Sequence, residues 1–252
     1  MRKRVLALEI STGEYNDFIE NILELSCNRT SSYVCVANVH MCIEAHHDAQ
    51  FREVVNNADM VTPDGMPLVF AMKKFYGIPQ QRVAGMDLLP DLLSIASQKN
   101  LKVFFYGGTT EMLTATEEYI SLNYPGIENP RYYSPPFREL TEEEEQMVVH
   151  KINDSGAHMV FAALGCPKQE RWMAKMKGRI NACMVGIGGA LPVMVGLQKR
   201  APLWMQKNGL EWFFRLLQEP RRLFKRYFIT NTLFIYLFLR EYVSLRLIRK
   251  IK

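Results

Sequence analysis

The stretch Val103-Phe-Phe-Tyr-Gly-Gly-Thr-Thr110 decides the fold class of this sequence. An apolar run without polar alternation ends in two glycines, and a helix-like segment over residues 109–123 follows, opening with Thr-Thr-Glu and ending before Pro125. An apolar run of this length is typical of a parallel strand that is buried on both faces. The stretch therefore predicts a strand, a tight turn and a helix in series.

Similar apolar runs recur along the chain. Strands are predicted at residues 4–9, 33–39, 60–62, 102–106, 158–164 and 182–187. Helix-like segments separate most of them, and Thr141-Glu-Glu-Glu-Glu145 places carboxylates in a first helical turn, where the helix dipole favours them. Strands that alternate with helices predict an α/β fold, here a Rossmann-like sandwich of doubly wound type with a mostly parallel sheet.

The composition is close to that of an average globular protein. Of 252 residues, 48% are apolar and 23% are charged, which argues against disorder, collagen-like repeats and a disulfide scaffold. The five cysteines are odd in number and form no Cys-x-x-Cys pair, so a reducing cytosol is the expected compartment. The apolar run after Met1-Arg-Lys-Arg4 is too short for a signal peptide, and we interpret it as a first strand.

The positive charge is concentrated towards the carboxyl end. Residues 199–252 hold 13 Lys/Arg and 3 Glu, a net charge of +10, whereas residues 1–198 hold 18 basic and 23 acidic residues, a net charge of −5. No strand candidate follows residue 190, and helices are predicted at 211–218, 220–227 and 228–252. We therefore predict a Rossmann-like domain over 1–198 and a helical, basic appendage over 199–252.

A basic, aromatic-rich appendage on a mildly acidic body indicates an anionic partner, either a membrane or a nucleic acid. Residues 227–239 carry no charge but number only 13, whereas a spanning helix needs about 20 apolar residues. We expect this segment to lie in a membrane interface or to pack on the body. An uncharged aromatic and aliphatic run suits lipid better than phosphodiester, so nucleic acid is the disfavoured partner.

Asp64 is the first candidate catalytic residue. It lies in Val61-Thr-Pro-Asp-Gly-Met-Pro67, where a short strand ends and a turn is predicted. Ligands of open α/β sheets bind beyond the carboxyl ends of the strands, and a carboxylate there can accept a proton from a substrate hydroxyl. The alternative is a common Pro-Asp-Gly turn without function.

Two further strand ends are candidate binding sites. Gly107 and Gly108 leave the N–H groups of the next helix free for a phosphate, although strand–Gly–helix turns also occur for steric reasons. In Ala162-Ala-Leu-Gly-Cys-Pro-Lys-Gln-Glu-Arg171, Gln169 and Glu170 are placed to hold a sugar or a ribose, the alternative being helix capping. Cys166 is a disfavoured nucleophile, since the sequence positions no histidine to activate it.

The appendage offers a set of cations. Arg215, Arg222 and Arg226 are spaced by seven and four residues, so one helical face can carry all three, with Lys225 near that face. Arginine forks match phosphate oxygens, and the alternative is a solvated charged face. No metal site is predicted, because the His and Cys residues within 40–47 lack four-ligand spacing and the sequence has no Asp-x-Asp pair.

In chain order, these motifs resemble the WecG/TagA/CpsF family of glycosyltransferases. The matching segments are Val36-Ala-Asn-Val-His40, Thr62-Pro-Asp-Gly65, Arg82-Val-Ala-Gly-Met-Asp87, Phe105-Tyr-Gly-Gly108, Tyr133-Ser-Pro-Pro-Phe137, Leu164-Gly-Cys-Pro-Lys-Gln-Glu170, Arg200-Ala-Pro-Leu-Trp204, Gly209-Leu-Glu-Trp-Phe-Phe-Arg215 and Glu219-Pro-Arg221. Each segment alone is modest, but the ordered set is highly specific.

The resemblance implies a bacterial enzyme at the cytoplasmic face of the membrane. It implies an inverting reaction, without metal or cofactor, that moves a sugar from a UDP-sugar to a polyprenyl-diphosphate-linked sugar. The products implied are wall teichoic acid, capsule, exopolysaccharide or enterobacterial common antigen. It also implies that the basic appendage closes over the site at the membrane.

The family's functional positions fall on particular residues here. The essential aspartate falls on Asp64, and the pocket arginine, the glutamine and the appendage cations fall on Arg82, Gln169, Arg215, Arg222 and Lys225. Asn38, in the first matching segment, is a further candidate for substrate binding. Many members have Thr-Pro-Asn and Ala-Phe-Asp where this chain has Val36-Ala-Asn38 and Ala190-Leu-Pro192. These departures leave open which sugar is transferred, N-acetylmannosamine or a related hexose.

Some alternatives stay open at this point. The resemblance is compatible with a non-catalytic subunit that assists another glycosyltransferase, but the presence of Asp64 favours a catalyst. The oligomeric state is open, a homo-oligomer included. The segment after Phe228 either inserts in lipid or packs on the body.

Overall fold

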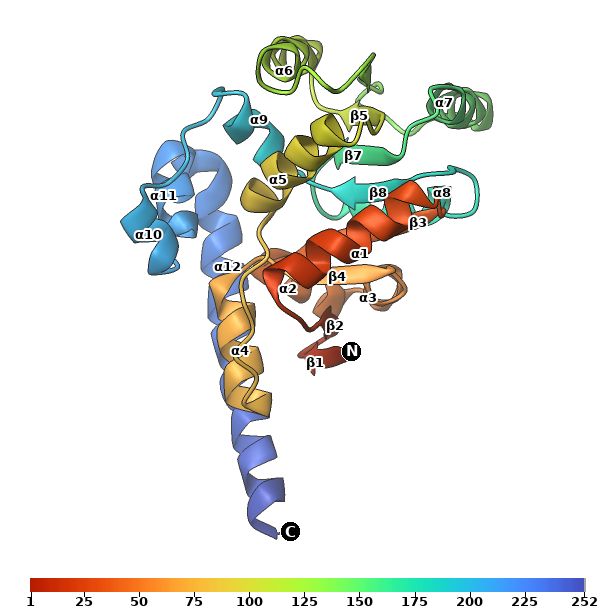
Figure 1. Ribbon diagram of the computed structural model, residues 1–252. Coiled ribbons are helices and arrows are strands. Elements are labelled where there is room, and N and C mark those ends of the chain that lie inside the picture. Colours follow the sequence, from red (N-terminus) through yellow and green to blue (C-terminus); the bar gives the residue numbers. More distant parts are fainter. Residues whose placement is uncertain (252) are drawn as a thin grey trace.

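A six-stranded parallel sheet forms the centre of the computed structural model, which describes residues 1–251, with side chains at all of these positions except 207 and 248–251. The strand order is β4-β3-β8-β7-β5-β6, and all neighbours run parallel. The strands are β3 (Ser32–Ala37), β4 (Met60–Pro63), β5 (Val103–Gly107), β6 (Arg131–Tyr133), β7 (Met159–Ala163) and β8 (Cys183–Gly186). Helices cover both faces (Figure 1), which confirms the predicted α/β sandwich.

Alternate residues of each strand face two separate cores, one on each side of the sheet. In β5, Phe104 and Tyr106 belong to one core, and Val103 and Phe105 belong to the other. The first core lies under α2 (Val39–His47), α3 (Ala49–Asn56), α4 (Met66–Tyr76), α7 (Glu142–Asp154) and α8 (Lys168–Met176), and the second under α1 (Tyr15–Cys27), α5 (Gly85–Gln98), α6 (Thr110–Asn123) and α9 (Ala190–Met194). Burial on both faces explains why the strands are apolar without alternation.

Two predicted helix starts are confirmed by their caps. Thr109 precedes α6 and its hydroxyl accepts a hydrogen bond from Met112 N at 3.2 Å. Thr141 and Glu144 form a reciprocal capping box at the start of α7. These side chains satisfy backbone N–H groups that the first helical turn leaves free.

The prediction of one strand over residues 4–9 was wrong. The chain forms an antiparallel hairpin of β1 (Arg2–Val5) and β2 (Leu8–Ser11), which is separate from the main sheet. Val5 pairs with Leu8, so only two residues make the turn, and Leu6 there adopts a φ of 54°. The strand β6 was not predicted, because three residues are too few to carry a periodic signal.

The appendage is helical as predicted, with α10 (Leu203–Lys207), α11 (Glu211–Gln218) and α12 (Pro220–Ile251). The two segments predicted at 220–227 and 228–252 are one continuous helix, and Lys252 lies outside the described residues. Figure 1 shows α12 running beside α4 and continuing past the body. Phe234 and Leu237 of α12 are buried in the first core, and Phe238 stacks on Phe75 with 5.1 Å between ring centres.

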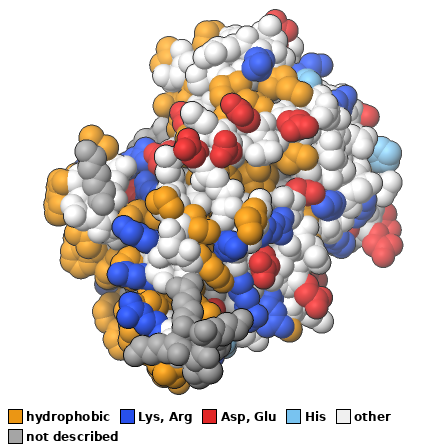
Figure 2. All heavy atoms as spheres, turned by 60° about the horizontal axis from the view of Figure 1, so that its bottom comes forward, with side chains coloured by type: hydrophobic (Ala, Val, Ile, Leu, Met, Phe, Trp, Pro, Cys, Tyr) orange, Lys and Arg blue, Asp and Glu red, His pale blue; other side chains and the backbone are white. Residues whose placement is uncertain are grey.

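The opposite side of α12 is exposed and apolar. Its large exposed side chains are Phe224, Phe228, Ile229, Ile235, Tyr236, Leu239, Val243 and Leu247. Figure 2 shows basic and hydrophobic side chains gathered on the face that holds the far end of this helix. Within residues 1–251, no helix combines the length and the apolar character that crossing a membrane requires.

Candidate active site

The carboxyl ends of the parallel strands bring the predicted site residues to one edge of the sheet. Asn38 and Asp64 directly follow β3 and β4, and Gly107 is the last residue of β5. Gln169 lies in the first turn of α8, which follows β7. This edge is where ligands of open α/β sheets bind.

Asp64 is a partly buried carboxylate without a partner. Its backbone N–H donates to Ala37 O at 2.9 Å, whereas its side chain makes no hydrogen bond or ion pair with any residue that the structure describes. Burial raises the pKa of Asp64 to about 7; the Arg82 and Arg215 guanidiniums oppose this rise, and the Glu211 carboxylate adds to it. A carboxylate with this pKa exchanges a proton near neutral pH, as a general base must.

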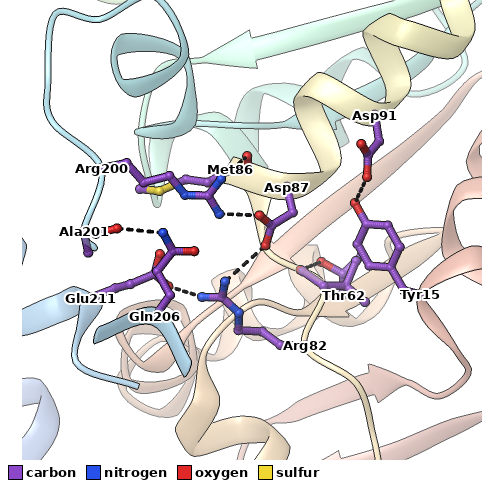
Figure 3. A network of polar contacts seen from close by, with 11 residues as sticks. Tyr15, Thr62, Arg82, Met86, Asp87, Asp91, Arg200, Ala201, Gln206 and Glu211 are labelled. Carbon is purple, nitrogen blue, oxygen red and sulfur yellow. Dashed lines mark hydrogen bonds and ion pairs between the residues drawn. The ribbon is translucent and has the colours of Figure 1, made fainter. Parts of the chain in front are cut away.

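Arg82 lies in a network of ion pairs (Figure 3), and the charge of Asp64 also acts on it. Its Nη2 lies 3.1 Å from Oδ2 of Asp87, and its Nη1 pairs with Oε2 of Glu211. The other oxygen of Asp87 pairs with Arg200. Because Glu211 begins α11 and Arg200 precedes α10, the network fastens the appendage to the ends of the strands.

The loop that carries Arg82 is fixed to the end of β4. Val83 N donates to Pro63 O at 3.0 Å, and Thr62 Oγ1 donates to Val83 O at 3.1 Å. Thr62 is fully buried, so this hydrogen bond is shielded from water. These two bonds hold the backbone of the Arg82 loop close to the end of β4, which Asp64 follows, although the whole of α4 separates the two residues in sequence.

Asn38 stands beside the Asp64-Gly65 turn. A Cβ on Gly65 would lie 3.7 Å from Asn38 Cα. The Asn38 Oδ1 accepts a hydrogen bond from Met41 N at 3.2 Å and caps α2. Its Nδ2 donates to no atom of the described residues, so an amide donor is left for a ligand.

Gln169 and Glu170 are buried behind the loop that follows β8. The Gln169 Oε1 accepts a hydrogen bond from Gly188 N at 3.0 Å, and its Nε2 donates to Glu170 Oε1 at 2.8 Å. Glu170 is fully buried, and burial raises its pKa, whereas hydrogen bonds from the Gln169 and Cys166 side chains oppose this rise. Gln169 therefore shapes the loop at 188–189, and contact of either side chain with substrate stays a prediction.

The glycine turn after β5 lies on the same edge but apart from Asp64. Gly107 and Gly108 have φ values of 105° and 81°, which favour glycine, and a Cβ on Gly107 would lie 2.9 Å from the Ala163 backbone. The sheet order places β3, β8 and β7 between β4 and β5, so about 19 Å separates the two strands. The turn thus has a steric reason for its glycines, and its role in binding stays a prediction.

Arg215 reaches the site from α11. A Cβ on Gly189 would lie 2.6 Å from Nη2 of Arg215, so the guanidinium lies against the loop after β8. Its charge also acts on Asp64. The expected single face of Arg215, Arg222 and Arg226 does not exist, because α11 ends at Gln218 and a new helix begins at Pro220.

The three cations of α12 lie in different surroundings. Arg222 is exposed and pairs with Glu219, and Lys225 is exposed. Arg226 is partly buried over the Tyr227 ring at 5.4 Å, and its Nε has no partner. Burial and the Arg226 charge together lower the pKa of His40, which places Arg226 near the start of α2.

The two stretches that depart from the family pattern lie in packed positions. Val36 is buried, and its Cγ1 would lie 3.6 Å from a Cβ on Gly85. The Cβ of Ala190 would also lie 3.6 Å from a Cβ on Gly85. Ala190 and Leu191 are both buried in the second core. Their burial shows packing within the body and leaves the identity of the sugar open.

Asp87, Arg200 and Glu211 are the residues of this site that the sequence did not single out. All three lie inside the motif segments that carry the resemblance, which is the signal that marked them. In the part of the chain that the structure describes, no three His, Cys, Asp or Glu side chains gather in a way that would hold a metal ion. Independence from metal stays a prediction.

Known proteins are similar to this sequence over most of its length. The sequence model of the glycosyl transferase WecG/TagA/CpsF family matches residues 3–247. Three relatives are named N-acetylglucosaminyldiphosphoundecaprenol N-acetyl-beta-D-mannosaminyltransferase. That of Bacillus spizizenii is 34% identical over 87% of this chain and 84% of its own length, that of Bacillus subtilis strain 168 is 30% identical over 77% and 74%, and that of Staphylococcus aureus strain MW2 is 27% identical over 87% and 85%. The chain therefore belongs to the glycosyl transferase WecG/TagA/CpsF family.

Proposed function

We propose that this protein is an inverting glycosyltransferase that moves a sugar from a UDP-sugar to a polyprenyl-diphosphate-linked sugar in bacterial cell-surface polysaccharide synthesis. The relatives' names support the acceptor, since each contains N-acetylglucosaminyldiphosphoundecaprenol. One observation carries the proposal: at the ligand-binding edge, Asp64 is an unpartnered carboxylate with a pKa of about 7. The donor sugar is N-acetylmannosamine or a related hexose.

In this mechanism Asp64 is the general base. It takes the proton of the acceptor hydroxyl while that oxygen forms a bond to the anomeric carbon of the donor. The bond from that carbon to the diphosphate oxygen breaks on the opposite face, and its electron pair leaves with UDP. A single displacement inverts the anomeric carbon, so an α-linked donor yields a β-linked product.

The appendage cations stabilise the leaving diphosphate, and no divalent metal or cofactor is needed. Arg215 is the cation among them whose charge acts on Asp64, and preorganised positive charge of this kind lowers the barrier to departure. Arg222, Lys225 and Arg226 extend the positive charge along α12 towards the lipid diphosphate. The proposed contacts with donor and acceptor are Asn38, Arg82, Gly107, Gly108, Gln169 and Glu170.

We assign catalysis to residues 1–198 and membrane association to the appendage, residues 199–252. The appendage carries a net charge of +10, and α12 has an exposed apolar side. Each basic residue near an anionic surface contributes about 1 kcal/mol of attraction. These features support a peripheral position at the inner face of the cell membrane, where the lipid-linked acceptor is held.

The test is a transfer assay with full-length protein, a panel of UDP-sugars and N-acetylglucosaminyl-diphosphoprenol as the acceptor. Asp64→Asn should lower turnover by about 10²–10⁴-fold. Asp154→Asn, an exposed carboxylate at the end of α7, is the matched control and should retain turnover. The anomeric configuration of the product, read by NMR, tests inversion. Wild-type turnover in Asp64→Asn would remove this residue from the mechanism.

A further inference from the structure

We propose that Glu211 is a positioning residue of this site: it holds Arg82 away from the Asp64 carboxylate and so leaves Asp64 free to accept a proton. The inference rests on the proposed role of Asp64 as the base. Glu211 would perform this task from the appendage, since it is the first residue of α11.

The geometry around Arg82 supports this assignment. Both terminal nitrogens of its guanidinium are engaged by carboxylates, Nη1 by Glu211 and Nη2 by Asp87. Asp87 is itself held by Arg200. Arg82 therefore has its strongest hydrogen-bonding partners on the side of α5 and α11, and it forms no ion pair with Asp64.

Four charged groups act on Asp64. They are Arg82 from the loop before α5, Asp87 from α5, and Glu211 and Arg215 from α11. The two cations lower the pKa of Asp64 and the two carboxylates raise it, while burial is the largest single influence. Without the Glu211 charge the cations would be in excess, and a guanidinium within about 4–6 Å lowers the pKa of a carboxylate by about 1–3 units.

The burial of Glu211 itself argues for more than a structural role. Its Oε1 is buried and has no hydrogen-bond partner among the described residues. A buried oxygen without a partner costs stability, and such a group in a folded protein calls for an explanation. Control of Arg82 beside the base provides one.

The test is Glu211→Gln in the full-length protein, a change that removes the charge but keeps the shape. The carboxyl carbon of Asp64 is followed by ¹³C NMR against pH without substrate, with its signal assigned by its loss in Asp64→Asn. We expect the titration midpoint of Asp64 to fall by about one pH unit, and the acidic limb of the pH profile of kcat to move with it. The control is Glu219→Gln, which removes a carboxylate that does not act on Asp64 and should leave the midpoint in place.

An unchanged or raised midpoint in Glu211→Gln would overturn the inference. If Glu211→Gln does not fold, Asp87→Asn loosens Arg82 from the other side and should lower the same midpoint. The titration needs no turnover, so it is separable from the proposed function. Full activity in Asp64→Asn would refute the role of Asp64 as general base. An unchanged titration midpoint of Asp64 in Glu211→Gln would refute only the role of Glu211.

Discussion

Replacing Asp64 with asparagine is expected to stabilise the fold at neutral pH while it lowers the rate of transfer. The usual pKa of this carboxyl is 3.8, and burial raises it to about 7 in the folded protein. Between about pH 4 and pH 7 the folded state therefore holds a proton that the unfolded state has lost. The stability of the wild-type protein must fall as the pH rises through this window, because ionised Asp64 is better accommodated by the unfolded chain.

The size of this effect follows from the difference of about three pH units between the two states. At 1.36 kcal/mol for each unit, ionised Asp64 lowers the free energy of unfolding by on the order of 4 kcal/mol. Asparagine has nearly the same shape and no charge, so Asp64→Asn should recover most of that amount above about pH 7. Below about pH 4 the carboxyl is protonated in both states, and the gain should vanish.

Urea unfolding of both proteins at a series of pH values measures this difference. The advantage of Asp64→Asn should grow from about pH 4 to about pH 7 and stay constant above about pH 8. Asp154→Asn, at an exposed position, should show no such trend. A wild-type protein that is as stable as Asp64→Asn near pH 8 would refute the reasoning.

Three other outcomes are expected. Phe234→Ala should lower the free energy of unfolding by about 3–5 kcal/mol, because Phe234 is buried in the core. Leu239→Ala, on the exposed side of α12, should change it by less than about 0.5 kcal/mol, and urea unfolding measures both values. The double variant Ile235→Ser, Leu239→Ser should sediment less with anionic liposomes than the wild-type protein, whereas Arg215→Ala should sediment as the wild type does but transfer less sugar. Equal sedimentation of the wild-type protein and both variants would show that the exposed side of α12 does not bind the membrane. EDTA should leave transfer unchanged, and activity that is lost in EDTA and restored by magnesium would contradict a metal-free mechanism.

Much of the fold could be predicted from local sequence. Five strands of the main sheet are apolar runs long enough to be recognised, and Thr109 and Thr141 mark helix starts through their own side chains. The hairpin at residues 2–11 could not be recognised, because its turn is made of Leu6 and Ala7, which carry no turn signal. The division of the tail into two helices failed, since Phe228 lies within one uninterrupted helix.

The site was predictable only in part, for a physical reason. Asp64 and Asn38 follow strands of a parallel sheet, so local sequence is enough to place them on one edge. The pairing of Arg82 with Glu211 depends on how the appendage docks, which no local pattern encodes. Arg215 and Arg222 lie on two different helices, α11 and α12, so their seven-residue spacing does not place them on one face. Arg222 pairs instead with Glu219, between the two helices.

The unbroken course of α12 sets a fixed relation between its two ends. At 32 residues it is about 48 Å long, and it begins two residues after α11, which carries Arg215. In a continuous helix each residue adds about 1.5 Å of length and rotates the next side chain by about 100° around the axis. The distance and the direction from one end to any side chain are therefore fixed by the number of residues between them. The positions of the exposed apolar residues along α12 therefore set the height and the tilt of the site above any surface to which this side of the helix binds.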